Sequence, residues 1–241
     1  MRNLSVAALQ ERFDNHQKLH RFEVDALFPG YKFTEIQYRY LEIGIRHQFI
    51  YDIETSDFDP EQNFIICYVG ILRDIVTGKT EHVQDSISKK DISKAVHEQT
   101  FNFDCRLLQT LSWNMKQAHH VIGHYSTKFD NPYFRSRCLF TKQEELIPHY
   151  GYQFYGDTWR MMKTTMKAKR NTLKNFIRQT TGNDEKTFVD LKYWYITHFK
   201  DHKLWQKSMN YIIDHCVKDV KMTYEGLLKA ELFNNIGRAK A

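Results

Sequence analysis

Residues 48–56 have the sequence QFIYDIETS. In its second half, acids alternate with apolar residues, which predicts a β-strand whose successive side chains point to opposite faces. Asp52 and Glu54 therefore lie side by side on one face. Two neighbouring carboxylates in a strand that enters a core repel each other and are costly to desolvate, so a divalent cation is the simplest partner. The alternative is a strand that ends in a solvated acidic turn, because Asp57 and Asp59 follow.

The composition is that of a soluble globular protein with a sizeable core. The chain has 241 residues, of which 41% are hydrophobic, and no apolar run approaches the roughly 18 residues needed to span a bilayer. We expect no signal peptide, since Glu11, Arg12 and Asp14 soon interrupt the first apolar stretch. The expected location is the cytoplasm, without binding to a membrane.

The cysteines are far apart in the chain, and no two of them form a CxxC pair. This spacing indicates neither a zinc knuckle nor a disulfide scaffold, so we expect buried free thiols. The four residues are Cys67, Cys105, Cys138 and Cys216.

Positive charge is concentrated in one part of the chain. The net charge is +6, and no acid occurs between Trp159 and Asn183. A solvated helix face usually mixes both signs, so this stretch favours contact with the phosphates of a nucleic acid. The candidate nucleic-acid-binding residues are Lys128, Lys163, Lys167, Lys169, Arg170 and Lys174.

Residues 1–47 are predicted to form a helical N-terminal extension. Residues 4–20 have an amphipathic pattern with Ser5 as its cap, and Thr34 with Gln37 makes a capping-box pattern for a second helix. This region contains no catalytic constellation. We expect a helical appendage packed on the main domain, with a clamp for a substrate or a partner as the alternative.

Residues 48–241 are predicted to form one α/β domain. Apolar runs and a turn signal at 77–79 predict strands over 48–56, 63–72, 80–84, 119–124 and 152–155. Helical periodicity predicts helices over 102–118, 131–142, 157–167, 171–181 and 202–231. The order of these elements indicates a five-stranded mixed sheet flanked by helices.

Two further segments carry acids. Residues 123–130 are GHYSTKFD, so Asp130 follows a strand and a polar turn at the start of a helix, where an aspartate is often simply the N-cap. His215 and Asp219 are four residues apart, so on a helix they share one face and point at one locus. A surface His–Asp pair is the alternative for this third segment.

The three segments, in this order and at these separations, resemble the three exonuclease motifs of the DEDD superfamily. The matching patterns are Asp-x-Glu on a strand, Gly-His-x-Ser-x-x-Phe-Asp, and Tyr-x-x-x-His-x-x-x-Asp. That superfamily has a ribonuclease H-like fold and includes the proofreading domains of DNA polymerases. The resemblance covers about residues 48–230 and leaves the N-terminal extension outside it.

The resemblance implies a 3′–5′ exonuclease acting on DNA, or alternatively on RNA. Asp52, Glu54, Asp130 and Asp219 match the four carboxylates that hold two divalent ions, Mg²⁺ or Mn²⁺, in the family. The family's general base is either a tyrosine four residues before the last aspartate or a histidine five residues before it. His215 is a histidine at the four-residue spacing, and it is the candidate base here.

The expected chemistry is metal-assisted phosphodiester hydrolysis. Four oxygen ligands suit Mg²⁺ or Mn²⁺ rather than Zn²⁺, because the motifs bring together no nitrogen or sulfur donors for zinc. Two ions about 4 Å apart stabilise both the attacking and the leaving oxygen of a phosphoryl displacement. An endonuclease on the same fold and a nucleic-acid-binding module without catalysis are the alternatives.

Other polar residues near the motifs have simpler interpretations. Histidines adjacent in a strand face opposite ways, so His119 and His120 are expected to be structural. Asp157 is expected to cap a helix. His124 and Tyr125 are weaker candidates for contacts with a substrate.

Overall fold

The computed structural model describes residues 5–149, 151–166, 168–183, 189–195 and 200–236. In these ranges, no helix combines the length and the apolar character needed to cross a membrane. Lys167, one of the predicted nucleic-acid-binding residues, lies outside the described residues.

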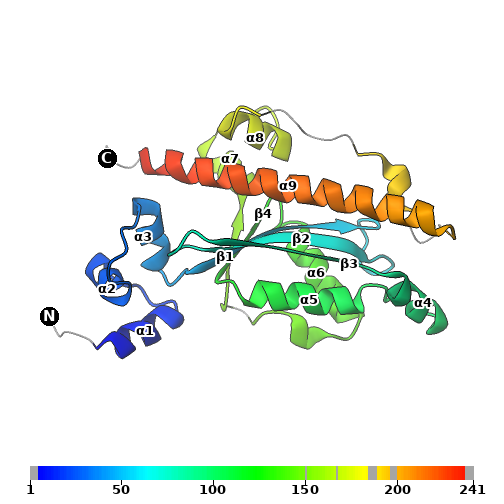
Figure 1. The fold of residues 1–241 in the computed structure, drawn as a ribbon, viewed down its shortest axis with the longest axis horizontal. Coiled ribbons are helices and arrows are strands. Elements are labelled where there is room, and N and C mark those ends of the chain that lie inside the picture. The colour runs from blue at the N-terminus through cyan, green and yellow to red at the C-terminus, as the bar shows by residue number, and fades with distance from the viewer. Residues whose placement is uncertain (1–4, 150, 167, 184–188, 196–199, 237–241) are drawn as a thin grey trace.

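A five-stranded mixed sheet forms the centre of the chain, as predicted (Figure 1). The order across the sheet is β3-β2-β1-β4-β5; β1 pairs antiparallel with β2 and parallel with β4. The central strand β1 therefore has both edges paired. The strands are β1 (His47–Thr55), β2 (Ile65–Asp74), β3 (Thr80–Ser86), β4 (His120–Gly123) and β5 (Phe154–Asp157).

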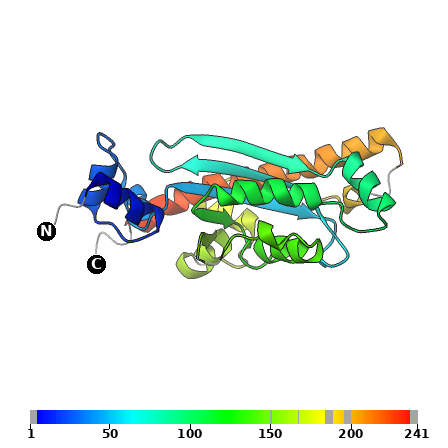
Figure 2. The same ribbon diagram turned by 90° about the horizontal axis from the view of Figure 1, so that it is seen from below.

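Helices cover both faces of this sheet (Figures 1 and 2). Two helices, α5 and α6, lie on one face, and the long helix α9 runs across β1 and β2 on the other, with α8 packed against it. The bounds of these helices are α5 (Cys105–Lys116), α6 (Asp130–Phe140), α7 (Thr158–Thr165), α8 (Leu173–Thr180) and α9 (His202–Ile236).

Alternate side chains of β1 enter the two helical layers. Tyr51 is buried, and its hydroxyl donates to Oδ1 of Asn131 on α6 at 2.7 Å. The ring of Phe49 lies over Gly70 of β2, where a Cβ would come within 2.1 Å of the ring, so a larger residue does not fit. Asp52, the next residue after Tyr51, faces the opposite layer and contacts Cys216 of α9.

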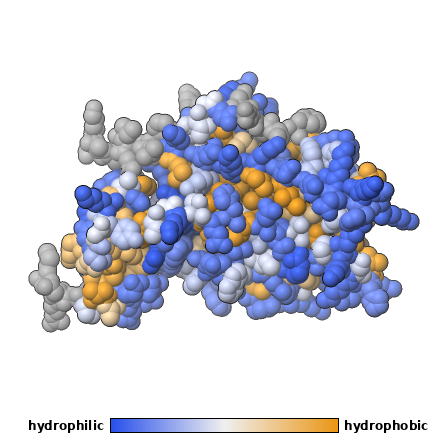
Figure 3. All heavy atoms as spheres, viewed as in Figure 1, coloured by the Kyte–Doolittle hydropathy of each residue, from blue (hydrophilic) through white to orange (hydrophobic). Residues whose placement is uncertain are grey.

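The N-terminal helices have a small hydrophobic core of their own. Their buried residues pack with Ile75 and Val76 from the turn between β2 and β3. The hydroxyl of Tyr40 donates to Oε1 of Glu231 on α9 at 2.6 Å, which is a second attachment to the sheet layers. Figure 3 shows hydrophobic residues at the surface over these helices. The helices are α1 (Val6–Asp14), α2 (Arg21–Leu27) and α3 (Glu35–Leu41).

Capping patterns in the sequence predict some helix ends correctly, but other helices are not predicted. Ser5 caps α1, as predicted, by accepting a hydrogen bond from the N–H of Ala8 at 3.3 Å. The helix is shorter than the predicted range because His16, with φ of 53°, turns the chain away. The sequence patterns do not predict α2 or α4 (Lys89–His97), although Ser88 and Asp91 form a capping box at the start of α4.

Candidate metal centre

The two acids of β1 lie beside a thiol of α9. Ligand oxygens of Asp52 and Glu54 and Sγ of Cys216 all lie within 4.8 Å of one another. The thiol of Cys216 donates to the backbone carbonyl of Asp52 at 3.4 Å and to Oδ2 of the same residue at 3.6 Å. Asp57 and Asp59, in the turn that follows β1, are exposed, whereas Asp52 and Glu54 are both partly buried. They share one face of the sheet, as the alternation along β1 predicts.

The surroundings raise the pKa of the Asp52 carboxyl well above its ordinary value. Burial is the largest cause, and the negative charges of Asp130, Glu54 and Asp219 add to it, whereas the hydrogen bond from Cys216 lowers the pKa. Carboxylates crowded in this way are stabilised by a bound cation, whose positive charge offsets their mutual repulsion.

Asp130 is the first residue of α6 and reaches across to β1. Its Oδ1 accepts a hydrogen bond from the backbone N–H of Ile53 at 3.2 Å. The N-cap of α6 is Phe129, so the interpretation of Asp130 as a helix cap is wrong. Burial raises the pKa of Asp130 to about 7, against the effect of its backbone hydrogen bonds.

His215 and Asp219 lie one turn apart on α9 and face the acids of β1. Nε2 of His215 is 3.7 Å from Oδ2 of Asp219 and 3.9 Å from Oε1 of Glu54. The side chain of His215 is 8% exposed, so the alternative of a surface pair is wrong. Segments far apart in the sequence thus bring Asp52, Glu54, Asp130, His215 and Asp219 to one place, and their catalytic and metal-binding roles remain predictions.

Asp157 holds the loop between β4 and α6 that leads to Asp130. Its Oδ1 accepts from the backbone N–H of Tyr125 at 2.9 Å, and its Oδ2 accepts from the N–H of Thr127 at 3.1 Å and from the hydroxyl of Thr127 at 2.6 Å. These bonds hold Tyr125 at φ of 68°, a strained conformation for a residue with a side chain. Asp157 also caps α7, as predicted, through the N–H of Trp159. Sequence reasoning missed the loop contacts, because they depend on the pairing of β5 with β4.

The donor atoms of this centre fit a divalent cation. The carboxylate oxygens of Asp52 and Glu54 are hard ligands of the kind that Mg²⁺ and Mn²⁺ take. The expectation that no sulfur donor lies near the acids is wrong, because Sγ of Cys216 belongs to the group. The sequence does hold a signal for this contact: Cys216 stands three residues before Asp219, so the two share a helix face.

Comparisons with known proteins give the fold class. No protein-family model matches this chain, and no curated protein matches its sequence. Among solved structures, the chain is similar to the family B DNA polymerase from the hyperthermophilic archaeon Pyrobaculum calidifontis, with a TM-score of 0.55 and 14% identity over 78% of this chain. The fold is ribonuclease H-like.

That fold class confirms the prediction of an α/β domain with a five-stranded mixed sheet flanked by helices. The similarity covers 24% of the polymerase, so the chain spans about a quarter of that protein's length. At 14% identity, the similarity establishes the fold and leaves the activity to be argued from the site.

A cavity of about 350 Å³ opens beside Glu54 and His215. Its wall includes two aromatic contacts: Phe58 meets Phe129 edge to face with ring centroids 5.8 Å apart, and the ring of Trp194 lies 6.1 Å from that of His215. Phe58 is 82% exposed, so its ring is accessible to a ligand in this cavity. The candidate metal centre therefore borders a cavity whose wall contains aromatic side chains.

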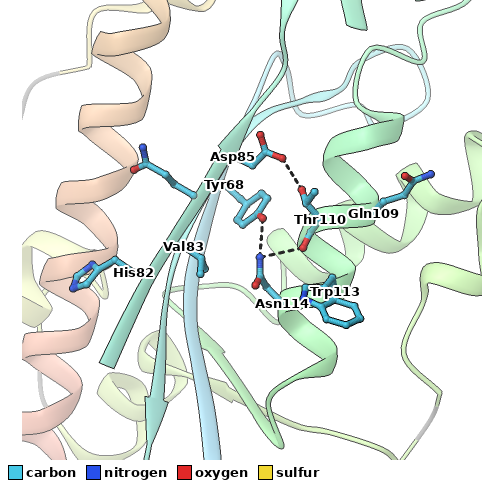
Figure 4. Close-up of a pocket in the computed structure, with 9 residues that line it drawn as sticks. Tyr68, His82, Val83, Asp85, Gln109, Thr110, Trp113 and Asn114 are labelled. Carbon is cyan, nitrogen blue, oxygen red and sulfur yellow. Dashed lines mark hydrogen bonds between the residues drawn. The ribbon is translucent and has the colours of Figure 1, made fainter. Parts of the chain in front are cut away.

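A second cavity, of about 580 Å³, lies between β3 and α5 (Figure 4). The hydroxyl of Tyr68 accepts a hydrogen bond from Nδ2 of Asn114 there at 2.8 Å. Asp85, the acid in its wall, already pairs with Arg106 at 2.5 Å and accepts from the hydroxyl of Thr110 at 2.8 Å. None of the predicted site residues lines this cavity, so it is separate from the candidate metal centre.

The predicted nucleic-acid-binding side chains lie on exposed surface wherever they are described. Nζ of Lys163 lies 5.3 Å from the ring centroid of Trp159 on α7, and the remaining described members lie in the loop before α6, between α7 and α8, or on α8. Their contact with nucleic acid remains a prediction. The exposed residues are Lys128, Lys163, Lys169, Arg170 and Lys174.

Proposed function

We propose that this chain is a metal-dependent 3′–5′ exonuclease that hydrolyses phosphodiester bonds of DNA. The observation that carries the proposal is the gathering of acids from β1, α6 and α9 around His215. The similarity of the fold to a DNA polymerase supports a role in nucleic-acid chemistry. The 3′–5′ direction and the preference for DNA rest on the resemblance of the three motifs to the DEDD exonucleases.

Each residue of the centre has a role in this proposal. Asp52, Glu54, Asp130 and Asp219 would hold two ions of Mg²⁺ or Mn²⁺, and this pair would supply positive charge to the phosphate that is cleaved and to the attacking water. His215 is the proposed acceptor of the proton of the attacking water, because its Nε2 lies beside the proposed ligands, 3.9 Å from Oε1 of Glu54 and 3.7 Å from Oδ2 of Asp219.

The cavity beside Glu54 is the proposed position of the terminal nucleotide. Stacking of a base on an aromatic side chain contributes about 1–3 kcal/mol and does not depend strongly on which base it is. Phe58 and Trp194 in the cavity wall offer such surfaces. Lys128 and the basic residues of α7 and α8 would contact phosphates, which fixes the position of a strand without selecting its sequence.

End-labelled single strands, incubated with Mg²⁺, Mn²⁺ or a chelator, test the proposal. We expect Asp52→Asn and Asp219→Ala to lose nearly all metal-dependent hydrolysis. His215→Ala is expected to keep metal binding and lose about 10²- to 10⁴-fold in rate, the usual contribution of a general base. Asp214→Asn is the matched control, because Asp214 is the neighbouring acid on α9 and is exposed to solvent. Wild-type activity in His215→Ala between pH 6 and 9 would remove His215 as the base.

Assays with linear, circular and RNA substrates distinguish an exonuclease from the alternatives. A strand labelled at its 5′ end should be shortened stepwise, and a circular strand should remain intact, because a strict exonuclease needs an end. Cleavage of the circle would instead identify an endonuclease. A parallel RNA strand measures the preference for DNA. Binding without hydrolysis, with both metals and all substrates, would identify a binding module.

A further inference from the structure

The thiol of Cys216 gives this centre a donor that hard cations do not use. Mg²⁺ and Mn²⁺ prefer oxygen ligands, whereas Zn²⁺ and Cd²⁺ bind thiolates well. Sγ of Cys216 already points at Asp52, at 3.6 Å from Oδ2, and it comes from a different element than the two acids. The three donors therefore converge on one point from β1 and α9.

We propose that Cys216, Asp52 and Glu54 form a binding site for a thiophilic divalent ion, Zn²⁺ or Cd²⁺. Such ions are often held by three protein ligands with the fourth position open. With bonds of about 2.0–2.3 Å, the ligand atoms of a tetrahedral ion lie about 3.4 Å apart. Donors that already lie within 4.8 Å of one another reach that spacing through small side-chain movements.

Binding exchanges a proton for the ion and involves no redox change. The S–H bond of Cys216 breaks, the sulfur–metal bond forms with the electron pair of the thiolate, and the proton leaves to the buffer. Entry is from the side of Glu54, which lines the open cavity of about 350 Å³. Nε2 of His215, 3.9 Å from Oε1 of Glu54, lies at the edge of this donor group.

The consequence is competition at the centre, which rests on the proposed function. A thiophilic ion occupies oxygens of Asp52 and Glu54 that the proposed hydrolysis requires for Mg²⁺ or Mn²⁺. Zn²⁺ is therefore expected to inhibit hydrolysis when Mg²⁺ is present, and added Mg²⁺ is expected to relieve the inhibition.

Cd²⁺ titration of the whole chain, without nucleic acid and without Mg²⁺, tests the site directly. A bond between Cd²⁺ and a thiolate gives a charge-transfer band in the ultraviolet. We expect the band to saturate at one equivalent in the wild type and to be absent in Cys216→Ser. Cys105→Ser is the control and should keep the band, because Cys105 lies at the start of α5, on the face of the sheet opposite to α9.

A second variant guards against misfolding of Cys216→Ser. Glu54→Gln keeps the thiol and changes a side chain that is only partly buried. We expect it to weaken Cd²⁺ binding by at least about 10-fold. Replacing a residue that only hydrogen-bonds to a metal ligand already lowers metal affinity by about that factor. Absence of the band in the folded wild type, its persistence in Cys216→Ser, or unchanged affinity in Glu54→Gln would each overturn the proposal.

The two proposals can fail separately. A wild-type chain that hydrolyses DNA with Mg²⁺ but gives no band with Cd²⁺ refutes only the thiophilic site. A chain that gives the expected band but hydrolyses no substrate refutes only the nuclease.

Discussion

Oδ1 of Asp130 accepts a hydrogen bond from the backbone N–H of Ile53, at 3.2 Å. This bond attaches the start of α6 to β1 at the residue between Asp52 and Glu54. Asp130 therefore has a structural contact in addition to its proposed role as a metal ligand. Two substitutions can separate these contributions, because asparagine retains an oxygen that accepts a hydrogen bond and alanine does not.

We predict that Asp130→Asn keeps the stability of the wild type, whereas Asp130→Ala lowers the free energy of unfolding by about 1–3 kcal/mol, since the N–H of Ile53 is left buried without an acceptor. Both variants should lose metal-dependent hydrolysis. Urea denaturation measures the first effect and the nuclease assay the second. If Asp130→Asn and Asp130→Ala destabilise the chain equally, the hydrogen bond to Ile53 does not account for the contribution of Asp130 to stability.

Asp157 organises the second motif without being a proposed ligand. Asp157→Ala removes the cap of α7 and leaves two backbone N–H groups of the loop, at Tyr125 and Thr127, without their acceptor. We expect a loss of about 2–4 kcal/mol in the free energy of unfolding, the sum of a lost cap and of unsatisfied donors. Hydrogen exchange at Tyr125 and Thr127 should become faster. Thr127→Val is the matched control, because it removes only the hydroxyl bond and should cost about 1 kcal/mol.

Gly226 of α9 allows α8 to pack closely. A Cβ at this position would come within 2.4 Å of the ring of Phe176. Helix propensity alone favours alanine over glycine by about 1 kcal/mol, so a loss of stability in Gly226→Ala would report the clash. We predict that loss, together with faster proteolysis between α7 and α8, where Lys169 and Arg170 lie. Adding Phe176→Leu should relieve part of the clash, so the double variant should lose less stability than the sum of the two single variants. A loss equal to that sum would argue against the clash.

His120 is neutral in the folded chain. Arg73 donates to Oε1 of Gln48 at 3.1 Å, which leaves the amide nitrogen of Gln48 to donate to Nδ1 of His120 at 3.3 Å. A nitrogen that accepts a hydrogen bond carries no proton. In agreement, burial lowers the pKa of His120 to about 4.

This shift predicts a loss of stability in acid. Between pH 6.5 and pH 4 the unfolded state binds the proton and the folded state does not, so the contribution of His120 is complete above pH 6.5 and declines as the pH falls. Between pH 7 and pH 4.5, we expect the free energy of unfolding to fall by about 2 kcal/mol more in the wild type than in His120→Gln. His82→Gln, at an exposed position of β3, is the control and should keep the wild-type dependence. Identical pH curves for all three proteins would contradict the prediction.

The sequence predicts those features that follow from the periodicity of a strand or a helix. Alternation along β1 and the four-residue spacing of His215 and Asp219 place both pairs correctly, because strand and helix geometry determine which side chains share a face. The loop contacts of Asp157 could not be predicted, since they depend on the parallel pairing of β4 with β5. The same helical spacing predicts that Cys216 lies on the face of Asp219, but none of the three motifs specifies a sulfur ligand.

The third motif lies within a single uninterrupted helix, α9, which has 35 residues. Trp205 near its start packs into the main core, and Glu231 near its end bonds to Tyr40, so both ends are anchored. One residue inserted between Trp205 and His215 would rotate one anchor relative to the motif by about 100°. Insertions and deletions within α9 should therefore be damaging, because they would turn one anchor away from the third motif.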